Sequence, residues 1–357
     1  MSVIGSHRAD SAIAIWLFCC AGLIFVTVVV GGVTRLTQSG LSMVQWQPVV
    51  GVVPPLSRPQ WQEAFRKYQQ FPEYKSVSRD MTLDQFKFIY LVEYGHRMLG
   101  RLIGLVFILP FIYFLMRRRI SMQLAPKLLF MFVLGGLQGL LGWYMVQSGL
   151  VDKPHVSQYR LVAHLALAVL IYAYIFRTAL ALIVVKWVKS ESTTRLSYFV
   201  LVLTLLILLM ILSGGFMAGT KAGFVYNTFP RMNGQWVPDE LLVLTPLWRN
   251  FFENVVTIQF IHRTAAVLVF GITVMIWWWS RRAHLPGAAC GAVSLLAMVA
   301  VTQITLGVLT LLYQVPVALG VAHQACALAL FTIALYVHYL LSPSRRADVG
   351  VSAHPEH

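Results

Sequence analysis

The sequence predicts an all-α membrane protein in which eight transmembrane helices form two tandem four-helix bundles related by a parallel pseudo-two-fold axis. Two observations support this fold class. Hydrophobic residues make up 58% of the 357-residue chain and charged residues only 11%, which is too apolar for a soluble domain. In addition, short motifs of the first half recur in the same order in the second half, which is the mark of an internal repeat.

Eight apolar segments are each long enough to cross a hydrocarbon core of about 30 Å, which takes about 20 helical residues. The first is too long to be the hydrophobic core of a signal peptide and is therefore a true span. The predicted spans are 11–33, 87–116, 127–147, 159–185, 196–218, 254–279, 288–312 and 318–341.

The net charge of +15 is distributed along the chain in a way that predicts topology rather than nucleic-acid binding. Basic residues flank the connections after every second span, whereas the short connections between them, 148–158 and 313–317, carry only Lys153. Because basic loops stay in the cytoplasm, both termini are expected there, and the long connections 34–86 and 219–253 are expected to lie outside, on the membrane surface. No Arg-rich, Ser-rich presequence is evident, which favours a bacterial inner membrane. The basic set is Arg117, Arg118, Arg119, Lys127, Lys186, Lys189, Arg195, Arg281, Arg282, Arg345 and Arg346.

The repeat divides the chain into residues 1–190, residues 191–345 and a cytoplasmic tail of residues 346–357. Each unit has four spans, an even number, so both units have the same orientation and a parallel two-fold axis follows. The matches are Gly31-Gly32, Thr37 and Gly40 with Gly214-Gly215, Thr220 and Gly223; His96-Arg97 with His262-Arg263; Gln138 and Gly142 with Gln303 and Gly307; and His164 with His323.

Four of the ten histidines, His96, His164, His262 and His323, occupy these matched positions inside even-numbered spans. Ionisable residues within a membrane are costly and are usually functional. One histidine on each of two helices per unit favours an iron porphyrin held between helices, because zinc needs more ligands in one cluster. We therefore predict one heme iron bound by His96 and His164, and a second bound by His262 and His323.

The two units differ in one chemical respect, because Glu93 of the first corresponds to Gln259 of the second. Glu93 lies three residues before His96, on the same helix face. Two interpretations stay open: a partner for a histidine or arginine, or a proton carrier beside the iron. Since glutamine cannot take up a proton, the asymmetry assigns catalysis to Glu93, His96 and His164, and a permanent heme to the second unit.

Three arginines, Arg97, Arg101 and Arg263, lie at or near the predicted ligands. Arginine binds carboxylates through two hydrogen bonds, so these residues are candidates for holding heme propionates, and Arg35 is a further one. The alternative is an arginine whose charged end reaches the membrane interface.

Long segments of the chain resemble the heme A synthase family, in the form shared by proteobacteria and mitochondria. The resemblance covers nearly the full length and includes the loops. It is carried by GGVTRLTQSGLSMVQWQPVVGVVPPL at 31–56, EYGHRMLGR at 93–101, GLQGLLGWYMVQSGL at 136–150, AGFVYNTFPRMNGQWVP at 222–238, and the histidine segments RLVAHLALA, IHRTAA and VAHQACA.

This resemblance implies an oxidoreductase that converts the C8 methyl group of heme O to a formyl group, through an alcohol, and so makes heme A for cytochrome oxidase. It implies that His96 and His164 hold the substrate heme O, that His262 and His323 hold a heme b cofactor, and that Glu93 is the essential acidic residue. Some members carry a cysteine pair in the first external loop, but residues 34–86 contain no cysteine, so thiol-based redox steps do not carry over.

The expected reaction needs oxygen from O₂ or water and an electron donor that the sequence does not identify. Heme O synthase and cytochrome oxidase assembly factors are further candidate partners, and a homo-oligomer is left open. Iron with two histidine ligands cannot bind O₂, so we hypothesise that His96 or His164 leaves, or never ligates, the reactive iron. The alternative function is a non-catalytic diheme b-type electron carrier, which would contain only protoheme. A heme prenyltransferase is disfavoured because no Asp-x-x-x-Asp pair occurs, and a transporter because inverted repeats are common there.

Overall fold

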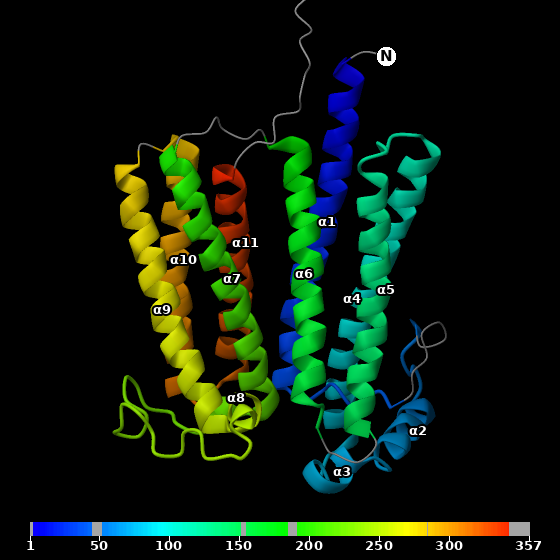
Figure 1. The fold of residues 1–357 in the computed structure, drawn as a ribbon. Helices are drawn as coiled ribbons and strands as arrows, with labels where there is room; N and C mark the ends of the chain where they lie inside the picture. The colour runs from blue at the N-terminus through cyan, green and yellow to red at the C-terminus, as the bar shows by residue number, and fades with distance from the viewer. Residues whose placement is uncertain (1–2, 45–51, 151–154, 185–190, 284, 343–357) are drawn as a thin grey trace, which may run out of the picture.

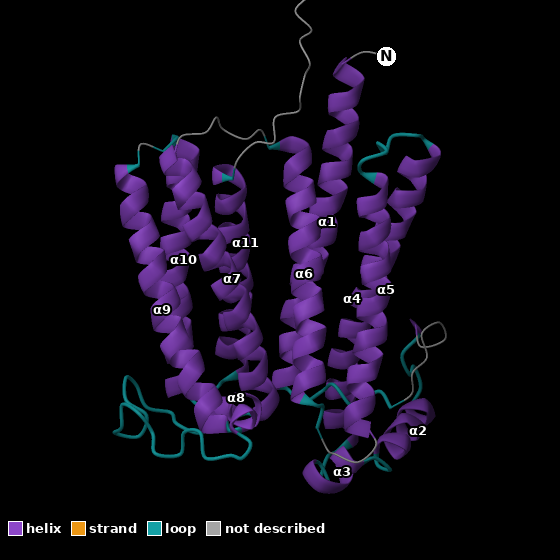
Figure 2. Ribbon diagram, in the orientation of Figure 1, coloured by secondary structure: helices purple, strands orange, loops and turns teal. Residues whose placement is uncertain are grey.

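The computed structural model describes residues 3–44, 52–150, 155–184, 191–283 and 285–342, which Figure 2 draws as helices and loops. Eight of the described helices are long and apolar enough to cross a membrane, which confirms the predicted all-α, multi-pass architecture. These helices are α1 (Val3–Leu36), α4 (Leu83–Met116), α5 (Ala125–Leu150), α6 (Gln158–Ile183), α7 (Glu191–Thr220), α9 (Val255–Arg282), α10 (Gly287–Leu312) and α11 (Val317–Leu341).

The shorter elements lie together at one end of the long helices, which we call the loop end (Figure 1). They are α2 (Arg58–Tyr68), α3 (Pro72–Val77), α8 (Asn250–Glu253) and the 3₁₀ turns Ala222–Phe224 and Leu247–Arg249. Helix α2 begins where Ser57 and Gln60 cap each other's backbone amides, and α4 begins with the same arrangement at Thr82 and Gln85. Such reciprocal caps satisfy amides that the first helical turn leaves unpaired.

A small aromatic core attaches α2 and α3 to the start of α4. The ring of Tyr68 stacks on that of Phe86 with 5.3 Å between centroids, and Ile89 is buried beside them. The described residues 52–86 of this connection therefore pack onto the bundle instead of forming a separate domain.

The long helices stand in two groups of four (Figure 1). Helices α1, α4, α5 and α6 form one group and α7, α9, α10 and α11 the other, and α1 and α6 pack against α7 and α11. A shared apolar core that includes Leu17, Leu128, Leu203 and Leu328 connects them. The exact two-fold relation between the groups stays a prediction. The predicted tail at 346–357 and the basic residues Lys153, Lys186, Lys189, Arg345 and Arg346 lie outside the described residues.

Candidate heme-binding site

The second pair of matched histidines faces each other across the second group of helices. The ring centroids of His262 on α9 and His323 on α11 are 6.5 Å apart, and the ring planes are 72° apart. A metal–imidazole bond is about 2.0–2.1 Å long and the ring centre lies about 1 Å behind the bonding nitrogen, so two rings on one metal have centres about 6 Å apart. The observed separation therefore fits one iron held between these two side chains.

Polar side chains on neighbouring helices contact ring nitrogens of His262, His164 and His323. Nδ1 of His262 lies 3.0 Å from the Ser213 hydroxyl on α7, which leaves Nε2 available as a ligand. Such an outer contact fixes the ring position and the tautomer of a ligating histidine. Two glutamines contact His164 and His323. Gln138 Nε2 lies 3.1 Å from Nδ1 of His164, and Gln303 Nε2 lies 3.4 Å from Nε2 of His323.

Unsatisfied ring nitrogens provide a test of whether a metal-bearing group fits. Nδ1 of His96 and Nδ1 of His323 are buried without a hydrogen-bond partner. Buried polar atoms are normally paired, but the described residues leave one nitrogen of each of these two rings without a bond. No cluster of three or more histidine, cysteine or acidic side chains occurs in the described part of the chain, so two histidines suit a porphyrin that brings its own four nitrogens.

Each of the four rings packs against a glycine on a neighbouring helix. A methyl group added at Gly31, Gly142 or Gly307 would press on Cε1 of the facing histidine and move the ring, whereas one added at Gly214 would be in ordinary van der Waals contact with His262. The distances are 3.0 Å for Gly31 and His96, 2.9 Å for Gly142 and His164, 3.7 Å for Gly214 and His262, and 2.9 Å for Gly307 and His323. These glycines are repeat-matched; His164 and His323 are contacted equally closely, while His262 has more room than His96.

Glu93 is 3% exposed and accepts three hydrogen bonds. Its Oε2 accepts from the Ser42 hydroxyl at 2.7 Å and from the Met43 amide at 2.8 Å. Its Oε1 accepts from Arg97 Nη2 at 2.6 Å. The repeat-matched Gln259 instead donates to the carbonyl of Tyr226 at 3.0 Å. Both side chains thus tie the α4 or α9 helix to the loop after α1 or α7, but only Glu93 brings a charge.

The arginines expected at the propionates contact protein groups in this structure. Arg97 also donates to the Met43 carbonyl at 2.9 Å, and Arg101 Nη1 lies 3.7 Å from the sulfur of Met98. Arg263 Nη2 donates to the carbonyls of Thr228 and Pro230, while its Nη1 is buried without a partner. Arg35 joins the two groups by donating to the carbonyls of Ala218 and Gly219 on α7.

A second buried carboxyl, Glu73 of α3, lies outside the spans at the loop end. Burial raises the pKa of Glu73 to about 7, and the Tyr68 hydroxyl that donates to it at 3.3 Å partly opposes this. Sequence analysis did not single out Glu73, because nothing in its local pattern shows that α3 folds under the bundle.

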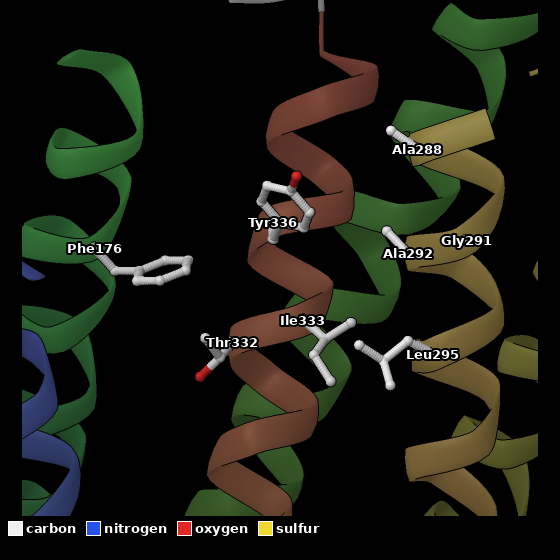
Figure 3. A pocket seen from close by; sticks show the side chains of 8 residues that line it. All are labelled: Phe176, Ala288, Gly291, Ala292, Leu295, Thr332, Ile333 and Tyr336. Carbon is white, nitrogen blue, oxygen red and sulfur yellow. The ribbon is translucent and has the colours of Figure 1, made fainter. Parts of the chain in front are cut away.

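Two hollows lie near the surface. One of about 500 Å³ is bordered by Ser42, Met43 and Arg97, next to Glu93. The other, of about 400 Å³, is an apolar groove between α6, α10 and α11 (Figure 3). Its lining includes Phe176 and Tyr336 but none of the four histidines, so the histidine pairs are separate from this groove.

Comparison with known proteins identifies the family. The family model described as cytochrome oxidase assembly protein (COX15-CtaA) matches residues 14–335. This chain belongs to that family. It is 54% identical to "Heme A synthase" of Nitrosospira multiformis over 92% of this chain and 93% of the relative. It is 43% identical to "Heme A synthase COX15" of Arabidopsis thaliana over 96% of this chain and 78% of the relative.

In this chain, the hydrogen-bond partners of the histidines were not assigned to the site from the sequence. Gln138 and Gln303 form a repeat-matched polar pair inside apolar spans. That pattern would have been sufficient to predict them as site residues. Ser213 has no such signal, because the repeat places Val30 at the corresponding position. Its contact with His262 became visible only once α7 and α9 were packed together.

Replacing Ser213 with alanine is expected to weaken heme retention by the second pair. Loss of an outer partner of a ligating histidine typically reduces metal affinity by about 10- to 100-fold. The heme-loss rate of the purified protein, measured by transfer to an apoprotein acceptor, reports this. Thr204→Val on the same helix is the control, because the Thr204 hydroxyl bonds the carbonyl of Val200 within its own helix. Equal heme-loss rates for Ser213→Ala and wild type would rule out the orienting role.

Proposed function

We propose that this chain is a heme A synthase, a membrane oxidoreductase that converts the C8 methyl group of heme O to a formyl group through an alcohol. The observation that carries the proposal is the identity of 43–54%, over nearly the whole chain, to relatives named "Heme A synthase". The facing histidines His262 and His323, 6.5 Å apart, support it, because this chemistry requires iron porphyrins within the membrane.

We assign the substrate site to residues 1–190 and the cofactor site to residues 191–345. In this assignment His96 and His164 hold heme O, and His262 and His323 hold heme b. A heme held by two histidines supplies electron exchange without binding oxygen. The substrate iron needs an open position for oxygen chemistry, so His96 or His164 leaves, or never ligates, it during the reaction.

In the proposed reaction Glu93 is the acid–base group beside the substrate. Its support is its burial, its place three residues before His96 and the neutral glutamine at the matched position. Arg97, hydrogen-bonded to Glu93 at 2.6 Å, balances the carboxylate charge. The hollow bordered by Arg97 and Ser42 is the place where we expect propionate groups or protons to reach the outer surface, and Arg263 would serve the second heme with its unpartnered Nη1.

The proposed setting is a bacterial inner membrane with both termini in the cytoplasm and the loop end outside. The basic connections described above support that orientation. The electron donor is a partner of the chain that we leave unassigned, as we do its oligomeric state.

The direct test expresses the chain with a heme O synthase in a host that makes no heme A. Extracted pigments are then separated by chromatography. Appearance of heme A, with heme O and protoheme in the purified protein, supports the proposal. Purified protein that carries only protoheme and leaves heme O unchanged would instead indicate the diheme electron carrier.

A further inference from the structure

Gln324 follows His323 on α11, and its side chain leaves its own group of helices. Its Nε2 donates a hydrogen bond of 2.7 Å to the backbone carbonyl of Val28 on α1. Its Oε1 fills the space beside Gly32, where an added methyl group would collide with it. The Gln324 side chain can cross the interface between the two groups of helices because Gly32 of α1 leaves space for it.

The same turn of α1 touches the first histidine pair. Gly31 precedes Gly32 and faces His96, with 3.0 Å between an added methyl group and Cε1 of the ring. A route therefore runs from His323 through the chain to Gln324, across one hydrogen bond to Val28, along α1 to Gly31, and from there across a non-bonded gap to the neighbouring ring of His96.

The repeat-matched crossing, from the residue after His164 to α7 of the second group, is built differently. Leu165 follows His164 on α6 and packs against Gly215 of α7, with its Cδ2 3.2 Å from an added methyl group. Leucine has no donor, so this crossing is an apolar contact. The two crossings, Gln324 to α1 and Leu165 to α7, thus occupy matched positions but differ in one hydrogen bond.

Another of the hydrogen bonds between the groups lies away from the histidines and provides a comparison. The Tyr172 hydroxyl of α6 and the Thr332 hydroxyl of α11 are 2.7 Å apart. Thr332 is nine residues after His323, which is about 13 Å further along a helix. This bond joins the same two groups of helices without touching a histidine or its neighbour.

We propose that Gln324 is a positioning residue that completes the path by which one electron passes from the iron held by His262 and His323 to the iron of the first pair. This inference rests on the function proposed above. The donor iron changes from ferrous to ferric, the acceptor iron gains the single electron, and no bond is formed or broken at Gln324. Electronic coupling falls off less steeply through covalent and hydrogen bonds than across gaps between non-bonded atoms. The hydrogen-bonded crossing at Gln324 therefore gives stronger electronic coupling than the apolar crossing at Leu165.

Replacing Gln324 with leucine copies the Leu165 crossing and is the test. The purified enzyme, loaded with both hemes, is held in aerobic turnover with a chemical reductant. The ferrous fraction of the protoheme is measured by absorption and by the ferric electron paramagnetic resonance signal of frozen samples. Gln324→Leu should raise this fraction and slow heme A formation several-fold, with protoheme content and midpoint potential unchanged.

Two further variants make the result specific. Gly32→Ala places a methyl group on α1 where the Gln324 side chain now lies and so displaces that side chain from the α1 side. This variant should also raise the ferrous fraction. Tyr172→Phe removes the comparison bond and should leave the ferrous fraction and the rate at wild-type values.

The inference is overturned if Gln324→Leu keeps the wild-type ferrous fraction and rate. It is also overturned if protoheme content or midpoint potential falls in parallel with the rate, because the bond would then hold the structure of the second site. Wild-type protein that forms no heme A would be a different result, since it contradicts the proposed enzyme and not the path.

Discussion

Gly142→Ala should expel the substrate heme while leaving the second heme in place. The added methyl group would lie 2.9 Å from Cε1 of His164, so the ring must move off its position. Overpacking of this kind costs about 1–3 kcal/mol, which corresponds to a loss of about 5- to 150-fold in heme O affinity. The ratio of heme O plus heme A to protoheme in the purified variant, measured by pigment chromatography, checks this.

Gly139→Ala is the matched control for Gly142→Ala. Gly139 lies one turn earlier on the same helix, and nothing lies within 4 Å of a methyl group there. Alanine is also the better helix former by about 1 kcal/mol. Gly139→Ala should therefore bind both hemes normally. Equal pigment ratios in the two variants would mean that the glycine cradle does not position His164.

Glu93→Gln should stop the oxidation of heme O without emptying either heme site. General acid–base catalysis contributes about 10²- to 10⁴-fold to rate, so a fall in the heme A formation rate of at least about 100-fold is expected. Glutamine keeps the size of the side chain and an oxygen that can accept from Ser42 or the Met43 amide. Turnover with reductant and oxygen, followed by pigment extraction, measures the rate and the heme content together.

A structural role for Glu93 would give a different pattern. Breaking a buried ion pair with Arg97 is costly, so loss of protein or of bound heme in Glu93→Gln would mean that the carboxyl mainly anchors the loop. Ser42→Ala serves as the control, because it removes one donor to Glu93 and keeps its charge and its pair with Arg97. That variant should retain most activity. A Glu93→Gln protein that forms heme A at the wild-type rate would exclude the acid–base role.

The eight spans were predictable from the sequence because a membrane requires long apolar helices, and hydropathy reports that directly. The membrane protein class and the family were confirmed, and the four histidines, the glycine pairs and the Glu93–Gln259 difference were found through the internal repeat. The rings of His262 and His323 lie 6.5 Å apart, and the binding of an iron by each histidine pair stays a prediction. The assignment of each pair to a particular heme stays a prediction.

The contacts that depend on how helices pack could not be predicted. Ser213, beside His262, and Gln324 of α11, which bonds to α1, are polar residues on long apolar helices. Their partners are set by helix rotation and crossing rather than by spacing along the chain. The contacts of two arginines with the loops were also not predicted. Arg97 and Arg263 were expected at propionates, yet both hydrogen-bond to backbone carbonyls of loop residues, because a chain that turns at the end of a helix leaves carbonyls that need donors.

The central claim is that each histidine pair holds its own iron porphyrin, and the heme content of a His323→Ala variant tests it most directly. Purified wild-type protein should contain protoheme together with heme O or heme A. His323→Ala should lose the protoheme and keep the farnesylated heme, because only the second pair has lost a ligand. A variant that retains protoheme at the wild-type level, or a folded wild-type protein without Soret absorption, would contradict the account.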